Sequence, residues 1–205
     1  MPLHLPVLTN QVIRFLEPKP GKIFIDCTLG VGGHTESLIT QLGNSGAVYG
    51  IEVDDRNLQK AQERLKSYSH VHYIRDNFEN LEEIAKNVLQ KEGKIDGILF
   101  DLGLSSLHVD ESERGFSFQS EGPLDMRFDT RQPLTAAVIA NTYSLKDLQF
   151  IFQIYGEEKF SYRIAKEMVE HRRREPFTTT SQLANCIANI FSRGKKDFYF
   201  KRHPA

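Results

Sequence analysis

The sequence lacks a long hydrophobic run, since no apolar stretch approaches the roughly 20 residues that a helix needs to cross a membrane. Its first residues also lack the basic start and the long apolar core of a secretory signal peptide. Cysteine is scarce, and the two present, Cys27 and Cys186, form neither a disulfide framework nor a metal-binding spacing. These absences predict a protein without a membrane partner or a bound metal, in the reducing cytoplasm.

An overall excess of either charge is also missing, because the formal net charge is −1. The charge is nevertheless divided unevenly. Residues 161–205 carry ten Lys or Arg and four Asp or Glu, which gives +6, and the other 160 residues carry 16 basic and 23 acidic side chains, which gives −7. A basic segment beside an acidic body predicts a polyanion-binding surface, and a solvated helix face is the alternative.

What is present is the composition of a globular protein, with 205 residues, 40% of them hydrophobic and 26% charged. The first hundred residues alternate between short apolar runs and amphipathic segments. We expect strands at residues 23–27, 47–53, 70–74 and 95–102, and helices at residues 34–42, 56–65 and 81–90. This alternation predicts an α/β fold with a parallel sheet and right-handed crossovers.

The pattern changes after residue 102. Residues 103–134 are rich in Gly, Ser, Asp and Arg and predict a long functional loop. Helical segments follow at residues 144–155, where Ser144 is the expected cap, and at residues 160–169 and 181–191. The expected organisation is therefore an α/β domain over residues 1–105, a functional loop over residues 106–134 and a basic helical region over residues 135–205.

Four strands are few for a doubly wound sheet, and residues 198–200 are the one weak candidate for another. We therefore expect that the chain is truncated and that its sheet is incomplete. The far edge of the fourth strand would then be unpaired, which predicts low stability or self-association, for example as a homodimer.

A glycine-rich turn follows the first predicted strand. It begins at Asp26, continues through Gly30, Gly32 and Gly33, and opens a helix. Glycines let the backbone approach a ligand, and the start of a helix offers free N–H groups. A dinucleotide fingerprint would have a third spaced glycine where this chain has Thr35. The turn predicts a nucleotide-like ligand without deciding which one.

The residues at the ends of the other strands narrow the choice of ligand. Glu52 lies at the end of the second strand, where a carboxylate meets ribose hydroxyls, Phe78 follows the third strand, and Asp101 ends the fourth. All of these ends meet at the carboxyl edge of the sheet. Acids at Asp26 and Glu52 and an aromatic side chain suit S-adenosylmethionine, which has a ribose and an adenine but no pyrophosphate. An NAD-dependent oxidoreductase is the alternative.

Eight blocks of sequence occur in an order that resembles one known family. They are residues 4–8 (HLPVL), 26–34 (DCTLGVGGH), 96–106 (DGILFDLGLSS), 113–118 (ERGFSF), 122–127 (GPLDMR), 135–137 (TAA), 155–158 (YGEE) and 203–205 (HPA). They are spread over essentially the whole chain, and the region from Glu113 to Arg127 is very specific. The chain resembles the bacterial 16S ribosomal RNA (cytosine-N4)-methyltransferase family, known as RsmH or MraW.

The resemblance implies a class I, Rossmann-like methyltransferase domain with an inserted helical domain. It implies S-adenosyl-L-methionine as the cofactor, and the N4 amino group of a cytidine in the decoding region of 16S rRNA in the small ribosomal subunit as the methyl acceptor. By matching position, the cofactor contacts would be Gly32, Gly33, His34, Glu52, Phe78, Asp101 and His108.

Given the methyl acceptor that the resemblance implies, the chemistry and position of other residues predict which of them meet RNA and carry catalysis. Asp101 is the candidate catalytic residue, as an acceptor near the cofactor and the base; the alternative is that it only orients the loop after it. The pocket for the target base is expected to contain Arg114, Phe116, Phe118, Asp125 and Arg127. The alternative is that the aromatic residues have a structural role and pack the long loop against the rest of the protein. A basic RNA-facing surface is expected from Arg172, Arg173, Arg174, Lys195, Lys196, Lys201 and Arg202.

The chain departs from the family pattern at several points. Glu52 stands where the family usually has Asp, and Leu107 and His108 replace Pro-Gln. The Asn/Asp-Pro-Pro-aromatic motif of many amino-methyltransferases is absent, and family members continue past residue 205. A catalytically weak or inactive chain that binds RNA or assists assembly is therefore a further alternative.

Overall fold

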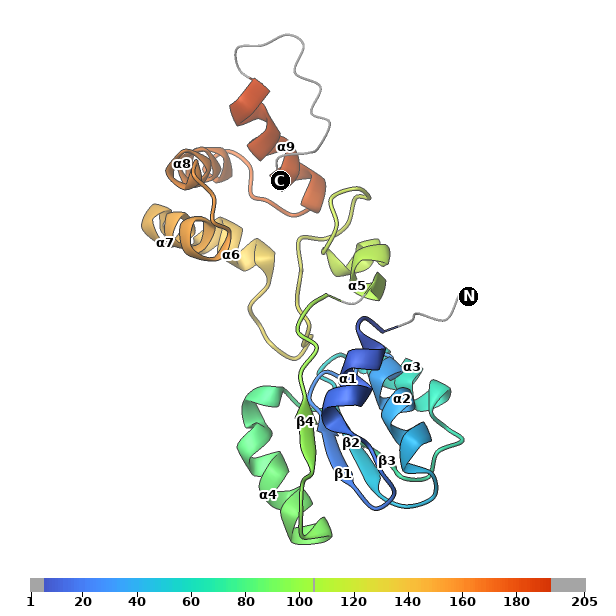
Figure 1. Cartoon of the computed structure of the whole chain (residues 1–205). Helices are drawn as coiled ribbons and strands as arrows, with labels where there is room; N and C mark the ends of the chain where they lie inside the picture. Colours follow the sequence, from blue (N-terminus) through green and yellow to red (C-terminus); the bar gives the residue numbers. More distant parts are fainter. Residues whose placement is uncertain (1–5, 105, 193–205) are drawn as a thin grey trace. The chain divides into compact units, whose positions relative to one another are not determined.

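The structure is a computed structural model that describes residues 6–104 and 106–192. The chain forms two compact units, Met1–Gly103 and Leu104–Ala205. Figure 1 shows strands and helices in the first unit and helices in the second. None of the helices in these described ranges is long and apolar enough to span a membrane.

The first unit contains a four-stranded parallel sheet, as the sequence predicts. Its strands are β1 (Ile23–Asp26), β2 (Ala47–Ile51), β3 (Val71–Ile74) and β4 (Gly97–Leu99), in the order β3-β2-β1-β4. In the register, Ile25 lies between Tyr49 of β2 and Ile98 of β4. This order matches the first four positions of a doubly wound Rossmann sheet. The predicted α/β class is therefore confirmed, with four of the six strand positions of such a sheet found in the described residues.

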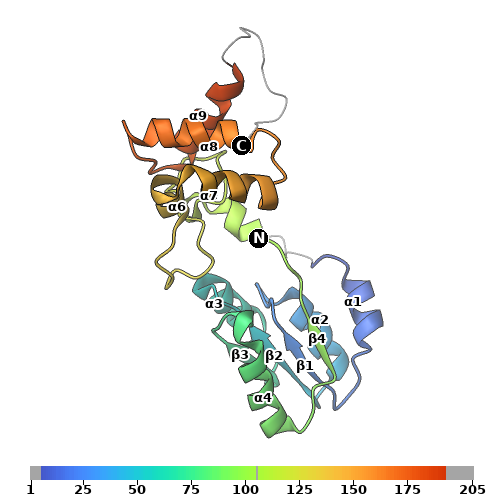
Figure 2. The same ribbon diagram turned by 90° about the vertical axis from the view of Figure 1, so that its left-hand side faces the viewer.

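Helices cover both faces of this sheet. The helices α1 (Thr9–Leu16), α2 (Gly33–Leu42) and α3 (Asp55–Arg64) lie on one side, where Phe24 and Val48 pack against Leu38. On the other side α4 (Leu81–Glu92) packs Ile84 against Ile25. Figures 1 and 2 show α4 and α2 on opposite faces. Alternate residues of each buried strand therefore pack into two separate cores, one on each face of the sheet. Because both faces are buried, the strand sequences are continuous apolar runs.

Two boundaries differ from the sequence expectations for physical reasons. Strands β1, β2 and β4 end earlier than predicted, and β4 ends at Leu99 rather than residue 102 because its partner β1 ends at Asp26, opposite Leu99. Helix α1 was not predicted: its N-cap residue Leu8 is in the left-handed conformation and makes no side-chain capping bond, so the sequence carries no start signal.

Strand β4 lies at one edge of the sheet. It pairs with β1, and within the described ranges no strand pairs with its other side. Ile98 and Phe100 are 41% and 45% exposed. Such an apolar edge is the kind of surface on which strand addition occurs. Self-association of the chain through this edge stays a prediction.

The second unit is helical. Its main helices are α6 (Ala136–Thr142), α7 (Leu145–Phe150), α8 (Ser161–Arg172) and α9 (Thr180–Ser192), and η3 (Ile151–Tyr155) continues α7 as a π-helical segment. Ser144 caps α7 by accepting a hydrogen bond from the Asp147 amide, as predicted. Leu148, Ile164, Met168 and Phe177 form the centre of its core.

The predicted long loop is not structureless, which corrects that part of the prediction. It contains the helix α5 (Ser106–Asp110) and the turn η2 (Ser112–Arg114), which ends at Gly115 in the left-handed conformation. A bridge between Pro123 and Thr179 ties the segment to the start of α9. The weak strand candidate at residues 198–200 lies outside the described residues.

Candidate active site at the carboxyl ends of the strands

Asp26, at the end of β1, is fully buried, and both of its carboxylate oxygens accept hydrogen bonds from within the protein. Its Oδ1 accepts a hydrogen bond from the Thr28 amide at 3.1 Å, and its Oδ2 accepts one from Thr35 Oγ1 at 2.7 Å. Burial raises the pKa of the Asp26 carboxyl group, although the hydrogen bond from Thr35 opposes the shift. Asp26 therefore connects β1 to the first turn of α2 and holds the glycine turn between them.

Two glycines of the glycine turn are required by the packing of the protein itself, independently of any ligand. Gly32 has a φ of 84°, and a Cβ placed there would lie 2.7 Å from Leu65 Cδ1 of the segment after α3. Gly33 faces Pro6 in the same way, with its closest approach at 3.1 Å. Around Gly30 the nearest atom to a Cβ, the Thr28 carbonyl oxygen, is 3.9 Å away. Of these three glycines, Gly30 is thus the one that borders open space.

We expect Gly32→Ala to lower the free energy of unfolding by about 2–3 kcal/mol, through left-handed strain of about 1–2 kcal/mol and the contact with Leu65. Gly93→Ala is the matched control, because Gly93 has a φ of 76° and a Cβ there meets nothing within 4 Å. Urea unfolding of both variants isolates the packing contribution. If both variants lost the same free energy of unfolding, the Leu65 side chain would have moved to accommodate the new Cβ, and packing would not be the reason for a glycine at position 32.

His34 and Asp101 lie side by side although they are distant in sequence. His34, in the first turn of α2, is buried, and its Nε2 is 3.4 Å from Asp101 Oδ2. The Asp101 side chain is 45% exposed. The Asp101 amide donates a hydrogen bond to Thr28 Oγ1 at 2.7 Å, so β4 is tied to the turn after β1. Two predicted site residues, and Thr28, which the sequence analysis missed, thus lie together at this edge.

Glu52 occupies the predicted position directly after β2. It is 9% exposed, and its Oε1 accepts a hydrogen bond from the Asp54 amide at 2.8 Å. Asp54 in turn caps α3 by accepting from the Arg56 amide. The Glu52 carboxylate is thus held in a fixed position by the turn between β2 and α3. Its predicted contact with a ribose stays a prediction.

Phe78 begins the short helix η1 (Phe78–Asn80) after β3 and lies against Phe100, which follows β4. Their ring centroids are 5.7 Å apart with planes at 85°, and the rings are 43% and 45% exposed. Such an edge-on aromatic pair offers apolar surface to a flat ligand ring. Phe100 is not among the predicted site residues, because the apolar run at residues 95–102 predicts a longer strand that includes it.

The other predicted site residues lie in the second unit. His108 of α5 is buried against Phe116 and Phe128, with ring centroids 5.1 Å and 4.9 Å away. Phe116 also lies 5.9 Å from the guanidinium of buried Arg114, whose Nη2 donates to the Arg127 carbonyl. Phe118 is 38% exposed. The predicted cofactor contact of His108 stays a prediction.

The predicted arginines differ in how their guanidinium groups are used. Arg127 makes two hydrogen bonds to Asp125 and holds down the pKa of that carboxyl group, and its Nη1 donates to the carbonyls of Thr130 and Gln132. Arg172 donates to the carbonyls of Ala140 and Tyr143 at the end of α6. These contacts brace the unit. Arg173 and Arg174 are exposed, and Lys195, Lys196, Lys201 and Arg202 lie outside the described residues.

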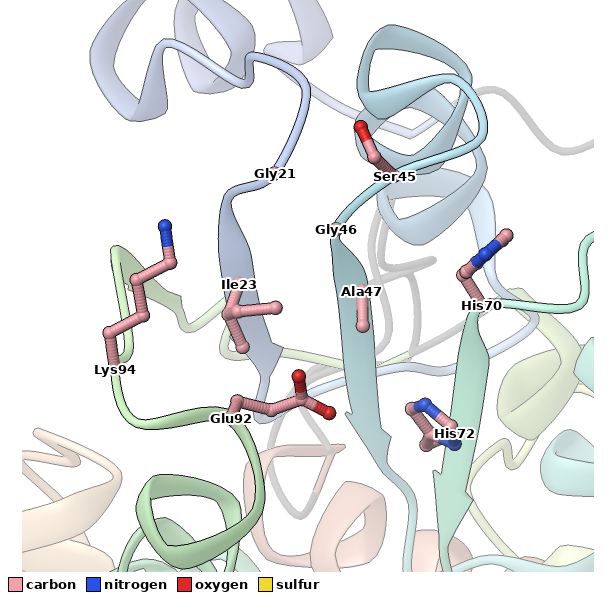
Figure 3. Close-up of a pocket in the computed structure, with 9 residues that line it drawn as sticks. All are labelled: Gly21, Ile23, Ser45, Gly46, Ala47, His70, His72, Glu92 and Lys94. Carbon is pink, nitrogen blue, oxygen red and sulfur yellow. The ribbon is translucent and has the colours of Figure 1, made fainter.

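A pocket of about 330 Å³ in the first unit lies at the opposite, amino ends of the strands. Figure 3 shows Glu92 extending toward Ala47 and His72, whereas Lys94 extends away from the two histidines. Glu92 already accepts a hydrogen bond from Tyr49 at 2.6 Å, and Lys94 is 3.4 Å from Asp96. The glycine turn and the strand-end carboxylates are at the other edge, so we place the candidate active site there.

Comparisons with known proteins identify the family of the chain. The whole chain, residues 1–205, matches the model of a family described as the MraW methylase family. Ribosomal RNA small subunit methyltransferase H of Caldicellulosiruptor saccharolyticus is 41% identical over 192 residues, covering 94% of this chain and 62% of the relative. The protein of the same name from Halothermothrix orenii is 44% identical over 184 residues, covering 90% and 58%. The chain thus spans less than two thirds of the length of these relatives.

Similarity to solved structures is weaker. An rRNA methylase from Streptococcus thermophilus has 27% sequence identity and a TM-score of 0.34, covering 39% of this chain and 45% of that protein.

Proposed function

Because this chain belongs to the MraW methylase family, we propose that its first unit binds S-adenosyl-L-methionine and that the protein methylates small-subunit ribosomal RNA. The finer proposal is that the acceptor is the N4 amino group of a cytidine in the decoding region of 16S rRNA. The observation that carries the proposal is one edge of the sheet, where the glycine turn, His34, Asp101 and Phe78 meet.

The residues at this edge suit the parts of the cofactor. Exposed apolar surface on Phe78 and Phe100 suits an adenine ring, and the carboxylate of Glu52, fixed after β2, suits ribose hydroxyls. The half-exposed carboxylate of Asp101 suits the cationic end of the molecule, and the open space beside Gly30 lets its amino-acid end approach the backbone. When bound, the cofactor supplies a methyl group activated by a sulfonium.

Cytosine N4 is a weak nucleophile because its lone pair is delocalised into the ring. The task left to the chain is alignment of the amino nitrogen and acceptance of its hydrogen bond as the N–C bond forms. Asp101 is suited to that task, since its carboxylate is anchored through the backbone by Thr28 and remains accessible from solvent. The proton released from N4 then has a carboxylate oxygen as its first acceptor.

RNA binding by this chain is part of the same proposal. The relatives described above are named as ribosomal RNA small subunit methyltransferases. In this chain, Arg173 and Arg174 are exposed after α8, and Phe118 offers partly exposed aromatic surface. Arginine pairs with phosphate and aromatic rings stack on unpaired bases, so these residues are the ones we assign to RNA.

The function is tested directly by incubating the chain with labelled S-adenosylmethionine and immature small ribosomal subunits. Digestion of the rRNA to nucleosides followed by mass spectrometry identifies N4-methylated cytidine. Transfer to another atom or another nucleotide would contradict the finer proposal. Binding of the subunit without any transfer would favour the alternative of an RNA-binding or assembly protein.

We expect Phe78→Ala to weaken S-adenosylhomocysteine binding by about tenfold, because each aromatic contact of this kind contributes about 1 kcal/mol or more. Isothermal titration calorimetry measures the effect, and Phe15→Ala is the matched control, because Phe15 of α1 is 81% exposed and outside the site. The same titration with NAD separates the two cofactors. NAD binding without S-adenosylmethionine binding would overturn the proposed function and favour an oxidoreductase.

A further inference from the structure

A buried imidazole at the active-site edge has one nitrogen in use and one without a partner. His34 Nε2 lies 3.4 Å from Asp101 Oδ2, while His34 Nδ1 is buried and has no hydrogen-bond partner among the described residues. The His34 side chain is only 7% exposed. A buried polar atom without a partner destabilises the folded state, so an apolar side chain would serve packing better. We therefore look for the role of the His34 imidazole in the contact between its Nε2 and Asp101.

The contact selects one form of the ring. A neutral imidazole carries its proton on one nitrogen and presents a lone pair on the other. With the proton on Nδ1, a donor would be buried without an acceptor, and the Nε2 lone pair would face the carboxylate. With the proton on Nε2, the N–H lies on the nitrogen that is 3.4 Å from Asp101 Oδ2, and only a buried acceptor is unsatisfied. The second form is the favourable one, and it makes His34 a donor to the Asp101 carboxylate.

Asp101 is thus held at two points. Thr28 Oγ1 fixes its backbone amide at 2.7 Å, and His34 approaches one of its carboxylate oxygens from the buried side. Among the residues that the structure describes, the carboxylate has no further hydrogen bond or ion pair. Its exposed part is thereby left for a ligand. The arrangement couples the first turn of α2 to the residue that follows β4.

We infer that His34 is a positioning residue, which orients the Asp101 carboxylate for cofactor and substrate through its Nε2–H. The inference rests on the proposed function and adds a role for the imidazole side chain. His34 acts through Asp101, so its removal matters only while the Asp101 carboxylate is present.

A double-mutant cycle tests this dependence. Isothermal titration calorimetry with S-adenosylhomocysteine is carried out on the whole chain and on His34→Leu, Asp101→Ala and the double variant. We expect His34→Leu to weaken binding about tenfold, and the double variant to bind no more weakly than Asp101→Ala alone. His34→Gln retains an N–H near the position of Nε2 and should restore binding to within about threefold of the unaltered chain. Additive losses, or no rescue by Gln, would overturn the inference.

A second measurement needs no ligand. Nitrogen-15 NMR of labelled histidines at neutral pH reports which ring nitrogen carries the proton, and the His34 signal is assigned by its loss in His34→Gln. We expect Nε2–H, and a shift of this signal in Asp101→Ala. Protonation on Nδ1, or a signal unmoved in Asp101→Ala, would overturn the inference. Failure of the unaltered chain to bind either S-adenosyl ligand would instead overturn the proposed function, and the NMR result would still decide whether His34 holds Asp101.

Discussion

Asp101→Asn should slow methyl transfer to the small ribosomal subunit by about 10²-fold to 10³-fold at saturating cofactor. The amide keeps the size of the side chain and one acceptor oxygen, but it removes the negative charge. That charge is needed most as the amino nitrogen of the base loses electron density to the new N–C bond. Cofactor affinity should fall much less, by about tenfold, because it depends on several other contacts.

The measurement is incorporation of a tritiated methyl group into immature subunits, followed as an initial rate. Glu63→Gln is the matched acid-to-amide control, because Glu63 on α3 has a 75% exposed side chain and pairs with Lys66 at the surface. It should retain the full rate. If Asp101→Asn also retained it, Asp101 would have no catalytic part. If the affinity fell while the rate at saturating cofactor did not, Asp101 would serve cofactor binding alone.

The architecture of this edge was accessible from the sequence because it depends on local rules. Apolar runs alternating with amphipathic segments predict a parallel sheet, and the carboxyl ends of parallel strands meet at one edge. Those two rules predict that Glu52, Phe78 and Asp101 lie at the same edge of the sheet. In the structure Glu52 directly follows β2, Phe78 begins η1 after β3, and Asp101 lies two residues beyond the end of β4 rather than in the strand.

The pairing of His34 with Asp101 was not accessible in the same way. It requires β4 to lie beside β1, a neighbour that is not consecutive in the chain, so no local spacing encodes it. Phe100 was missed for a related reason: its apolar character favours a strand interior, and only the early end of β4 at Leu99 places it beside Phe78.

In the second unit, the count of charged residues does not predict which arginines are free to bind RNA. It treats every arginine alike, whereas Arg172 caps the end of α6 and Arg127 is bound to Asp125. A local signal for the latter does exist, since the spacing of Asp125 and Arg127 recurs in Asp129 and Arg131 with the same paired geometry. An acid two residues before an arginine in a loop is therefore a reason to expect an internal brace.

Asp26→Ala should lower the free energy of unfolding by about 3 kcal/mol, the largest stability effect that we expect at the site. It removes the acceptor of two buried hydrogen bonds and leaves the Thr28 amide and the Thr35 hydroxyl without it. Asp26→Asn is the matched variant, because its amide can accept from Thr28 and donate to Thr35 Oγ1. We expect that variant to lie within about 1 kcal/mol of the unaltered chain at neutral pH.

The two side chains should differ in their dependence on pH. Burial raises the pKa of Asp26 above its ordinary value of 3.8, so the folded chain retains a proton that the unfolded chain releases. The contribution of Asp26 to stability is therefore greatest below about pH 4 and falls as the pH rises through the folded-state pKa. Asn does not titrate, so the stability of Asp26→Asn relative to the unaltered chain should increase over that range.

Urea unfolding followed by circular dichroism between pH 4 and pH 8 measures this difference, and hydrogen exchange over residues 23–42 assigns it to the first unit. A constant difference across that range would show that burial does not raise the pKa of Asp26. Because Thr35 and His34 are consecutive residues of α2, loosening the bond to Thr35 should also loosen the imidazole beside Asp101. Asp26→Ala should therefore weaken S-adenosylhomocysteine binding at temperatures where the variant is still folded, whereas Asp26→Asn should not.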